Sequence, residues 1–129
     1  MAETQRIAGP DLSGLDALVV EDDEISAEIM DGMLRALGVR RPRLATNVHE
    51  ALLSLRKQRP DIVLLDASLQ GLVAHRVAEE LIEAKIPFLV VTGYAREALP
   101  AIFKGAPFLP KPCSMPGLVN AVLSVIGRS

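Results

Sequence analysis

The sequence predicts an α/β fold in which a doubly wound, five-stranded parallel sheet is covered by helices on both faces. Five short apolar runs alternate with segments of helical periodicity, and each run closes in polar or charged residues. Alternating strands and helices are typical of parallel sheets, and right-handed crossovers place five helices over the two faces. The 129 residues, half of them hydrophobic, suit one domain with a buried core.

The first strand and helix follow a polar stretch that contains a Gly-Pro pair. We expect residues 1–14 to form a flexible leader and residues 15–129 to form the folded domain. Residues 15–20 are an apolar run closed by four acids, which is typical of a buried strand. A helix of about fourteen residues follows, and Gly38 is its predicted C-terminal cap. Its apolar stripe comprises Ile25, Ile29, Met30, Met33, Leu34 and Leu37.

The second strand is predicted at residues 44–46, after a basic turn. Asn47, followed three residues later by Glu50, indicates a capping box and the start of a helix that Pro60 ends. The apolar stripe of this helix comprises Val48, Ala51, Leu52 and Leu55. Residues 61–65 are the most convincing strand, because an almost unbroken apolar run leads directly into an acid.

The last part of the chain contains two more strands and two more regular helices. The third helix has Val73, Val77, Ala78, Leu81 and Ile82 on its apolar face. Residues 87–91 and 107–109 are the fourth and fifth strands. Pro100 interrupts the helical pattern between them, so we expect any helix there to be short. Ser114 is a predicted N-cap for the last helix, whose apolar face comprises Leu118, Val119, Val122, Leu123 and Ile126.

Composition excludes several classes of protein. Lysine and arginine number 14 against 16 acids, and this net charge of -2 argues against a general nucleic-acid binder. A single cysteine, Cys113, cannot form an internal disulfide or make a zinc site alone. No apolar run is long enough to cross a bilayer, and the N-terminus lacks a signal peptide's apolar stretch. We therefore expect a cytoplasmic protein that binds neither nucleic acid nor membrane.

Polar side chains follow four of the predicted strands: Glu21 and Asp22, Asp66, Thr92 and Lys111. They should converge, because the carboxyl ends of parallel strands meet at one edge of the sheet. Three carboxylates held close repel one another unless a cation is present, and Mg²⁺ is the usual hard divalent ion. A hydroxyl and an ammonium group are suitable donors for phosphoryl oxygens. The pattern therefore indicates phosphoryl transfer onto a carboxylate.

Four segments resemble the signature blocks of bacterial two-component response regulator receiver domains. They read LVVEDDE at 18–24, DIVLLD at 61–66, LVVTG at 89–93 and FLPKP at 108–112. Each block is weak evidence alone, but all four occur in order at predicted strand ends. The resemblance extends over nearly the whole chain. It implies a flavodoxin-like sheet with strand order 2-1-3-4-5 and a stand-alone, single-domain response regulator.

The resemblance implies an acceptor and a metal site. Asp66 would accept a phosphoryl group from the phosphohistidine of a sensor histidine kinase or a histidine phosphotransfer protein. Asp22 would bind Mg²⁺ directly and Glu21 would hold it through water. Asp66 and the backbone carbonyl of Ser68 would complete the ligands from the protein. Such a domain catalyses only its own phosphorylation and slow dephosphorylation, so it is a switch and not an enzyme in the ordinary sense.

The resemblance also implies how the switch works. Thr92 and Lys111 would bind the phosphoryl oxygens, and Phe108 takes the place of the switch aromatic that turns inward when Thr92 moves. Tyr94 would lie beside the phosphoryl group and hinder the hydrolytic water. The Lys111–Pro112 bond would be cis, which X–Pro bonds tolerate. The switched surface would bind an unidentified downstream protein.

Three departures from the family pattern concern the output surface and leave the acceptor set complete. Thr92 and Lys111 lie closer together in the sequence than in most receivers, which shortens the region of the fourth helix. Gln70 stands where many receivers have proline, and Cys113 stands where phenylalanine is common. Residues 87–94 resemble a smaller subgroup of receivers that often stand alone.

Other functions stay open at this point. A pseudo-receiver would bind partners without taking phosphate, and a phosphate sink would only drain a phosphorelay. A haloacid-dehalogenase-like phosphatase also uses an aspartyl nucleophile, but it needs an acid two residues later, where this chain has Ser68. A flavodoxin-like flavin binder needs a hydroxyl-rich phosphate loop after the first strand. This chain has four acids there, which would repel the phosphate.

Overall fold

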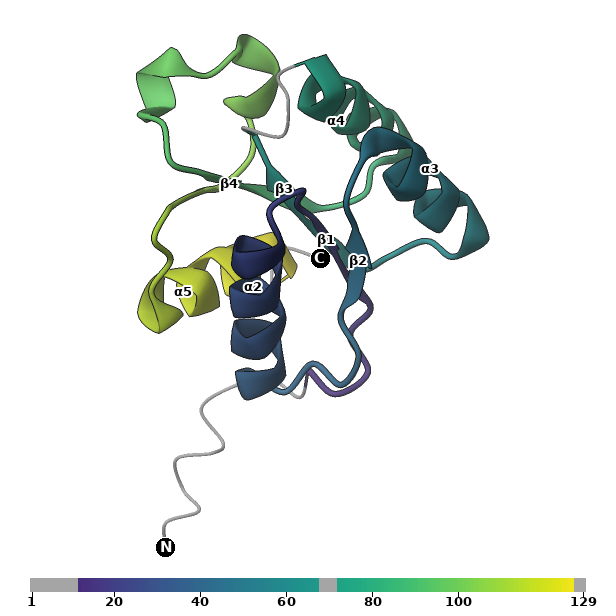
Figure 1. Cartoon of the computed structure of the whole chain (residues 1–129), viewed down its shortest axis with the longest axis vertical. Helices are drawn as coiled ribbons and strands as arrows, with labels where there is room; N and C mark the ends of the chain where they lie inside the picture. The colour runs from purple at the N-terminus through teal and green to yellow at the C-terminus, as the bar shows by residue number, and fades with distance from the viewer. Residues whose placement is uncertain (1–11, 68–71, 127–129) are drawn as a thin grey trace, which may run out of the picture.

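The computed structural model describes residues 12–67 and 72–126, and it contains a central sheet between two layers of helices (Figure 1). The strands are β1 (Ala17–Val20), β2 (Arg43–Ala45), β3 (Ile62–Asp66), β4 (Phe88–Thr92) and β5 (Phe108–Pro110). The helices are α2 (Glu24–Ala36), α3 (Val48–Lys57), α4 (Leu72–Ala84) and α5 (Met115–Ile126). Two 3-10 turns, η1 (Arg96–Ala98) and η2 (Ala101–Phe103), lie between β4 and β5.

The five strands are all parallel, in the order β2-β1-β3-β4-β5. The predicted doubly wound, flavodoxin-like sheet is therefore confirmed. The register aligns the carboxyl ends of the strands: Val20 pairs with Leu65, Asp66 pairs with Val91, and Thr92 is the partner of Pro110. Polar residues at these ends consequently meet at one edge of the sheet.

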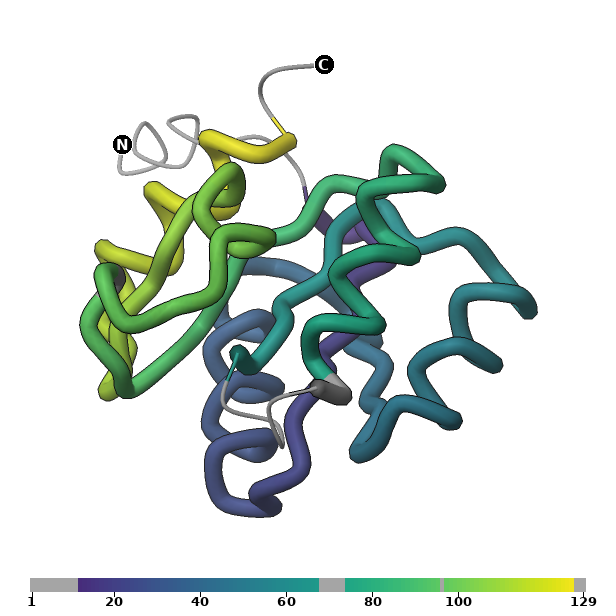
Figure 2. The backbone as a smooth tube through the Cα atoms, turned by 90° about the horizontal axis from the view of Figure 1, so that it is seen from above, coloured from purple at the N-terminus to yellow at the C-terminus, as the bar shows by residue number. Residues whose placement is uncertain are grey.

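The sheet is buried on both faces, which explains why its strands read as unbroken apolar runs. Helices α2 and α5 pack on one face, while α3, α4 and the two 3-10 turns pack on the other (Figures 1 and 2). Successive residues of β3 alternate between the two cores: Ile62 and Leu64 face α2 and α5, whereas Val63 and Leu65 face α3 and α4.

The predicted helix caps are present. Asn47 accepts a hydrogen bond from the Glu50 backbone N–H at 2.9 Å, and Ser114 accepts one from the Gly117 N–H at 3.1 Å. Gly38 has φ +113°, a left-handed conformation that suits glycine after a helix. The capping box differs in one detail. The Glu50 carboxylate accepts from the Thr46 backbone N–H and hydroxyl, not from the N–H of Asn47.

The expectation of five helices is wrong for the described part of the chain, which has four α-helices. The segment between β4 and β5 instead forms η1 and η2 on either side of Pro100 (Figure 2). The proline cannot donate a backbone hydrogen bond to an earlier turn, so a continuous helix does not form. The segment is still anchored, because Leu99 and Phe103 are buried in the core beside α4.

Two of the predicted apolar stripes are wrong in part. Ile25 and Ile29 of α2 are 69% and 54% exposed, and Ile82 of α4 is 51% exposed. The residues of α2 that face the sheet are Ala27, Met30 and Leu34, whose spacing of three and four defines a narrower stripe. No helix in the ranges 12–67 and 72–126 is long and apolar enough to cross a membrane.

Candidate functional site

Four strands deliver one functional side chain each to the carboxyl edge of the sheet. Glu21 follows the last residue of β1, Asp66 ends β3, Thr92 ends β4, and Lys111 follows β5. Backbone hydrogen bonds fix these positions. The Glu21 N–H donates to the Ala45 carbonyl at 3.0 Å, and the Lys111 N–H donates to the Thr92 carbonyl at 2.8 Å. The sequence prediction that these residues converge is confirmed.

Lys111 joins the two buried carboxylates. Its Nζ lies 2.9 Å from Glu21 Oε1 and 3.3 Å from Asp66 Oδ2. The carboxylates of Glu21 and Asp66 are almost fully buried, whereas the Lys111 side chain is 23% exposed. A buried carboxylate is costly unless it is paired and hydrogen-bonded, so the ammonium group stabilises both acids in a region that water hardly reaches.

The electrostatics of this trio favour the protonated form of Glu21. Burial and, to a smaller extent, the neighbouring Asp66 carboxyl raise the pKa of Glu21, and the Lys111 ammonium lowers it, so that the net pKa is about 7. Burial alone would lower the pKa of Lys111, but its contacts with Glu21 and Asp66 outweigh that effect and raise the pKa overall. Two acids served by one lysine leave the site short of positive charge.

Three carboxylates of the site fit a divalent cation. Oxygen atoms of Glu21, Asp22 and Asp66 lie within 4.8 Å of one another. Asp22 is exposed and the other two are buried, so the cluster is open to solvent on one side. Hard oxygen donors in an open, negatively charged cluster are the ligands that Mg²⁺ prefers, since this ion keeps several waters. Ser68, the remaining predicted ligand, lies outside the described residues, as does Gln70.

Of the predicted switch residues, Thr92 ends β4 at this edge, whereas Phe108 is the first residue of β5. Thr92 is fully buried, and its Oγ1 accepts a hydrogen bond from the Tyr94 backbone N–H at 2.9 Å. The Tyr94 side chain is 60% exposed, and Phe108 is half-buried against the core that faces α3 and α4. The Lys111–Pro112 peptide bond is cis, as the sequence predicted.

Asp23 supports the site in a way that the sequence analysis missed. Its backbone N–H donates to Glu21 Oε2 at 3.1 Å, while its carboxylate accepts from the Ser26 N–H at 2.8 Å and caps α2. Asp23 therefore both orients the Glu21 carboxylate and caps the start of α2. An aspartate directly before a helical run is a recognisable N-cap signal. Only the fold shows that the same residue holds Glu21.

Comparisons with known proteins agree with this geometry. Residues 17–123 match the family model described as the response regulator receiver domain. The chain is 34% identical over 120 residues to the sensor histidine kinase AtsR of Burkholderia thailandensis, covering 85% of this chain but only 19% of that protein. It is 27% identical over 117 residues to the polar-differentiation response regulator DivK of Brucella anthropi, covering 85% of this chain and 94% of DivK.

A solved structure shows the same architecture. The receiver domain of the sensor histidine kinase PA1611 from Pseudomonas aeruginosa superimposes with a TM-score of 0.76 at 25% identity, covering 88% of this chain and 98% of that domain. That structure holds a magnesium ion in its active-site cleft. The family match, which spans most of the chain, and the site at the sheet edge agree. The chain belongs to the response regulator receiver domain family of two-component signalling.

Proposed function

We propose that this protein is a single-domain response regulator that accepts a phosphoryl group on Asp66 in an Mg²⁺-dependent reaction. The observation that carries the proposal is the position of the Asp66 carboxylate. It ends the central strand β3, lies 3.3 Å from Lys111 Nζ, and shares a cluster of oxygen atoms with Glu21 and Asp22. An acid in this position lies beside the Lys111 ammonium and within a cluster of carboxylates that could hold a metal ion.

The proposed reaction transfers a phosphoryl group from a nitrogen atom of the donor to an oxygen atom of Asp66. An Asp66 carboxylate oxygen attacks the phosphorus of a phosphohistidine, the new O–P bond forms, and the P–N bond breaks to release the imidazole. The Lys111 ammonium and the Thr92 hydroxyl would hold the oxygens of the transferred phosphoryl group. Asp22, Asp66 and Glu21 would hold Mg²⁺, with the Ser68 carbonyl as a further ligand. The bound ion supplies positive charge that offsets the carboxylates and the phosphoryl oxygens.

The hydrogen bond between Thr92 and Tyr94 would link the phosphoryl-acceptor site to the exposed segment between β4 and β5. If the Thr92 hydroxyl moves toward a phosphoryl oxygen, the 2.9 Å bond from the Tyr94 N–H must break or follow. Tyr94 begins the segment that carries η1 and η2, so a change at Thr92 biases the conformation of that segment. The exposed Tyr94 side chain, two residues after Thr92, would slow the hydrolytic water. Phe108, at the start of β5, would adjust to the same movement.

The proposed partners are a sensor histidine kinase or a histidine phosphotransfer protein as phosphodonor, and a protein that recognises the switched surface. Two of the similar proteins are sensor histidine kinases, which supports a partner of that class. We propose a cytoplasmic location for the same reason, because kinase and receiver must meet. The protein would turn over no free substrate and would catalyse only its own phosphorylation and dephosphorylation.

The test uses acetyl phosphate as a small phosphodonor and intact-mass measurement as the readout. The wild type should gain one phosphoryl group only when Mg²⁺ is present, and Asp66→Asn should gain none. Asp31→Asn is the matched control, since Asp31 is an acid on α2 whose partner is Arg35. A wild type that stays unlabelled with Mg²⁺ would indicate a pseudo-receiver. Rapid return of the label to a phosphotransfer protein would instead indicate a phosphate sink.

A further inference from the structure

The sheet has two edge strands, β2 and β5, and the backbone groups that face outward from them differ. In an extended strand, the N–H and C=O of one residue point to one side, and those of the next residue point to the other side. At β5 the Lys111 N–H donates to the Thr92 carbonyl, so the backbone of Pro110 faces outward. Proline has no N–H to donate, and the edge at β5 is therefore poorly suited to an added strand.

The edge at β2 is open at Leu44. The Glu21 N–H donates to the Ala45 carbonyl at 3.0 Å, so the backbone of Ala45 faces β1 and that of Leu44 faces away from the sheet. No strand of the described chain lies on that side of β2. At the next outward position the Thr46 N–H donates to the Glu50 carboxylate at 2.8 Å, which ends the open stretch. The N–H and C=O of Leu44 can therefore pair with an added strand.

A groove of about 340 Å³ lies between this edge and helix α2. Leu44 and Ile25 line the groove, and they are 51% and 69% exposed. Its lining also includes three acids of α2, which are Glu24, Glu28 and Asp31. Their spacings of four and three residues place them along one side of the helix. The groove therefore combines exposed apolar side chains, a row of carboxylates and an unpaired strand edge.

The side chains that line this groove attract positive charge. Two of the three acids, Glu24 and Glu28, form no ion pair with any residue of the described chain. Arg43 also lines the groove, but its guanidinium binds the Asp16 carboxylate at 2.9 Å and the Ser54 carbonyl at 3.2 Å. Because Ser54 belongs to α3, which covers the opposite face of the sheet, this cation does not neutralise the acids of α2.

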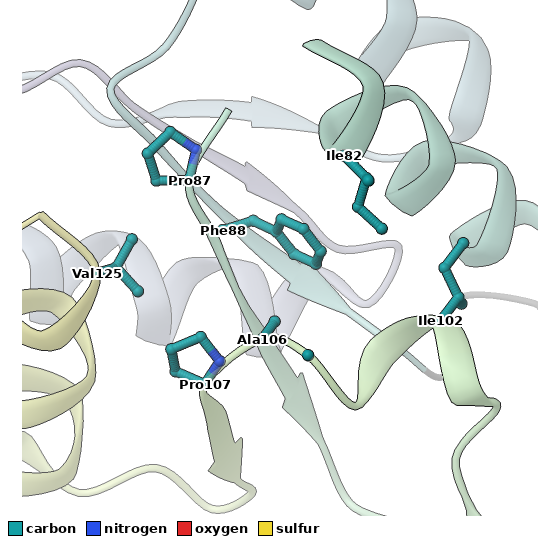
Figure 3. A pocket seen from close by; sticks show the side chains of 8 residues that line it. Ile82, Pro87, Phe88, Ile102, Ala106, Pro107 and Val125 are labelled. Atoms are coloured by element: carbon teal, nitrogen blue, oxygen red, sulfur yellow. The ribbon is translucent and has the colours of Figure 1, made fainter. Parts of the chain in front are cut away.

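A larger groove shows what distinguishes this one. It has a volume of about 450 Å³, and its lining residues, among them Phe88, Pro107 and Val125, are all uncharged (Figure 3). Its lining has no charge that would select one class of partner over another. At β2, charge and backbone pairing both select, and they select the same kind of partner.

We propose that β2 and α2 bind an extended segment of another protein, which adds a sixth strand beside β2. Main-chain hydrogen bonds to Leu44 supply affinity, and the side chains at alternate positions of the segment supply specificity. Those that face α2 are apolar opposite Leu44 and basic opposite Glu24 and Glu28. A second copy of this chain does not suit the site. Two-fold pairing of the β2 edges would place both α2 helices on one face of the joined sheet, with their acids toward one another.

The test uses the full chain without Mg²⁺ or a phosphodonor, so its result is independent of the proposed phosphorylation. The probe is a fluorescent seven-residue peptide in which valine, lysine and valine alternate with serine and threonine. Fluorescence anisotropy measures its binding, and NMR-detected hydrogen exchange reports on the Leu44 amide. The peptide should bind, and exchange at Leu44 should slow because its outward N–H gains an acceptor. Added salt should weaken the binding, because it screens the lysine from the acids.

One variant and one altered peptide decide whether the acids of α2 select the partner. Glu28→Lys replaces attraction by repulsion, and it should weaken binding by about fivefold or more. Glu83→Lys makes the same change at an exposed position of α4, away from the groove, and should leave the affinity unchanged. A peptide with glutamate in place of lysine should bind the wild type more weakly than the original peptide does.

Three results would overturn the proposal. The first is a wild type that does not bind the peptide at millimolar concentration. The second is equal affinity of the wild type and Glu28→Lys. The third is a bound state in which the Leu44 amide exchanges as fast as in the free protein, because the peptide then binds without adding a strand to β2.

Discussion

The raised pKa of Glu21 makes a quantitative prediction for the stability of the metal-free protein. Burial and the neighbouring Asp66 raise that pKa from 4.5 to about 7. At a pH between these two values, the folded protein therefore holds a proton on Glu21 that the unfolded chain has already lost. The stability that this proton contributes is fully present below pH 4.5, and it is lost as the pH rises through 7. Replacing Glu21 with glutamine removes the titration and keeps the size and the hydrogen-bonding oxygen.

The magnitude follows from the size of the shift. Each pKa unit corresponds to about 1.4 kcal/mol, so a rise from 4.5 to about 7 corresponds to about 3 kcal/mol. For a domain of this length, that difference is about 10 °C in melting temperature. Between pH 5 and 8, the wild type should lose roughly this much free energy of unfolding relative to Glu21→Gln.

The assay is urea unfolding of both proteins across that pH range at constant ionic strength, with chelator present. Glu28→Gln is the control, because Glu28 is an exposed acid on α2 and should follow the wild type. Adding Mg²⁺ should stabilise the wild type more at pH 8 than at pH 5, since the metal competes with the Glu21 proton. If Glu21→Gln and the wild type give parallel curves of stability against pH, the reasoning about burial is wrong.

Three further predictions address the metal, the switch segment and the packing of α5. Asp22→Ala should abolish both phosphorylation and the Mg²⁺ binding that isothermal titration measures. The same change should raise the stability of the metal-free protein, because it removes one of the carboxylates that repel each other. An unchanged affinity for Mg²⁺ would refute the metal assignment. Hydrogen exchange across residues 93–105 should slow when beryllofluoride is added in the presence of Mg²⁺, and equal, high protection in both states would place the switch elsewhere. Gly117→Ala should destabilise the fold by about 1 kcal/mol, because the added Cβ would meet Ser114 Oγ at 3.0 Å and Leu109 Cδ1 at 3.1 Å. Gly32→Ala, which meets nothing within 4 Å, should stabilise α2, and thermal unfolding of both variants compares them.

The sheet was predictable from the sequence because its strands are buried on both faces. Apolar runs without alternation, separated by helical segments, are typical of strands in a parallel sheet. The predicted bounds of β3 and β4 are one residue early for an instructive reason. Asp66 and Thr92 are polar, yet both still pair in the ladder, with Val91 and Pro110. The first polar residue after each apolar run belongs to the site, but it is also the last residue of its strand.

The helices were less predictable because an apolar residue is not always a buried one. Ile25 and Ile29 have the spacing of an inner stripe, but Ala27 and Met30 occupy the side of α2 that meets the sheet. The site was largely predictable, because parallel strands bring their first polar residues together. What the sequence did not reveal is that Lys111 contacts two acids at once and that the Asp23 N–H holds Glu21. Those contacts depend on side-chain geometry in three dimensions.

The identity of the phosphorylated residue tests the central claim most directly. After phosphorylation with acetyl phosphate and Mg²⁺, borohydride reduction converts an aspartyl phosphate to homoserine, which peptide mass spectrometry can locate. Homoserine is expected at position 66 and nowhere else. Reduction at Glu21 or Asp22, or a labelled protein with Asp66 unmodified, would contradict that claim.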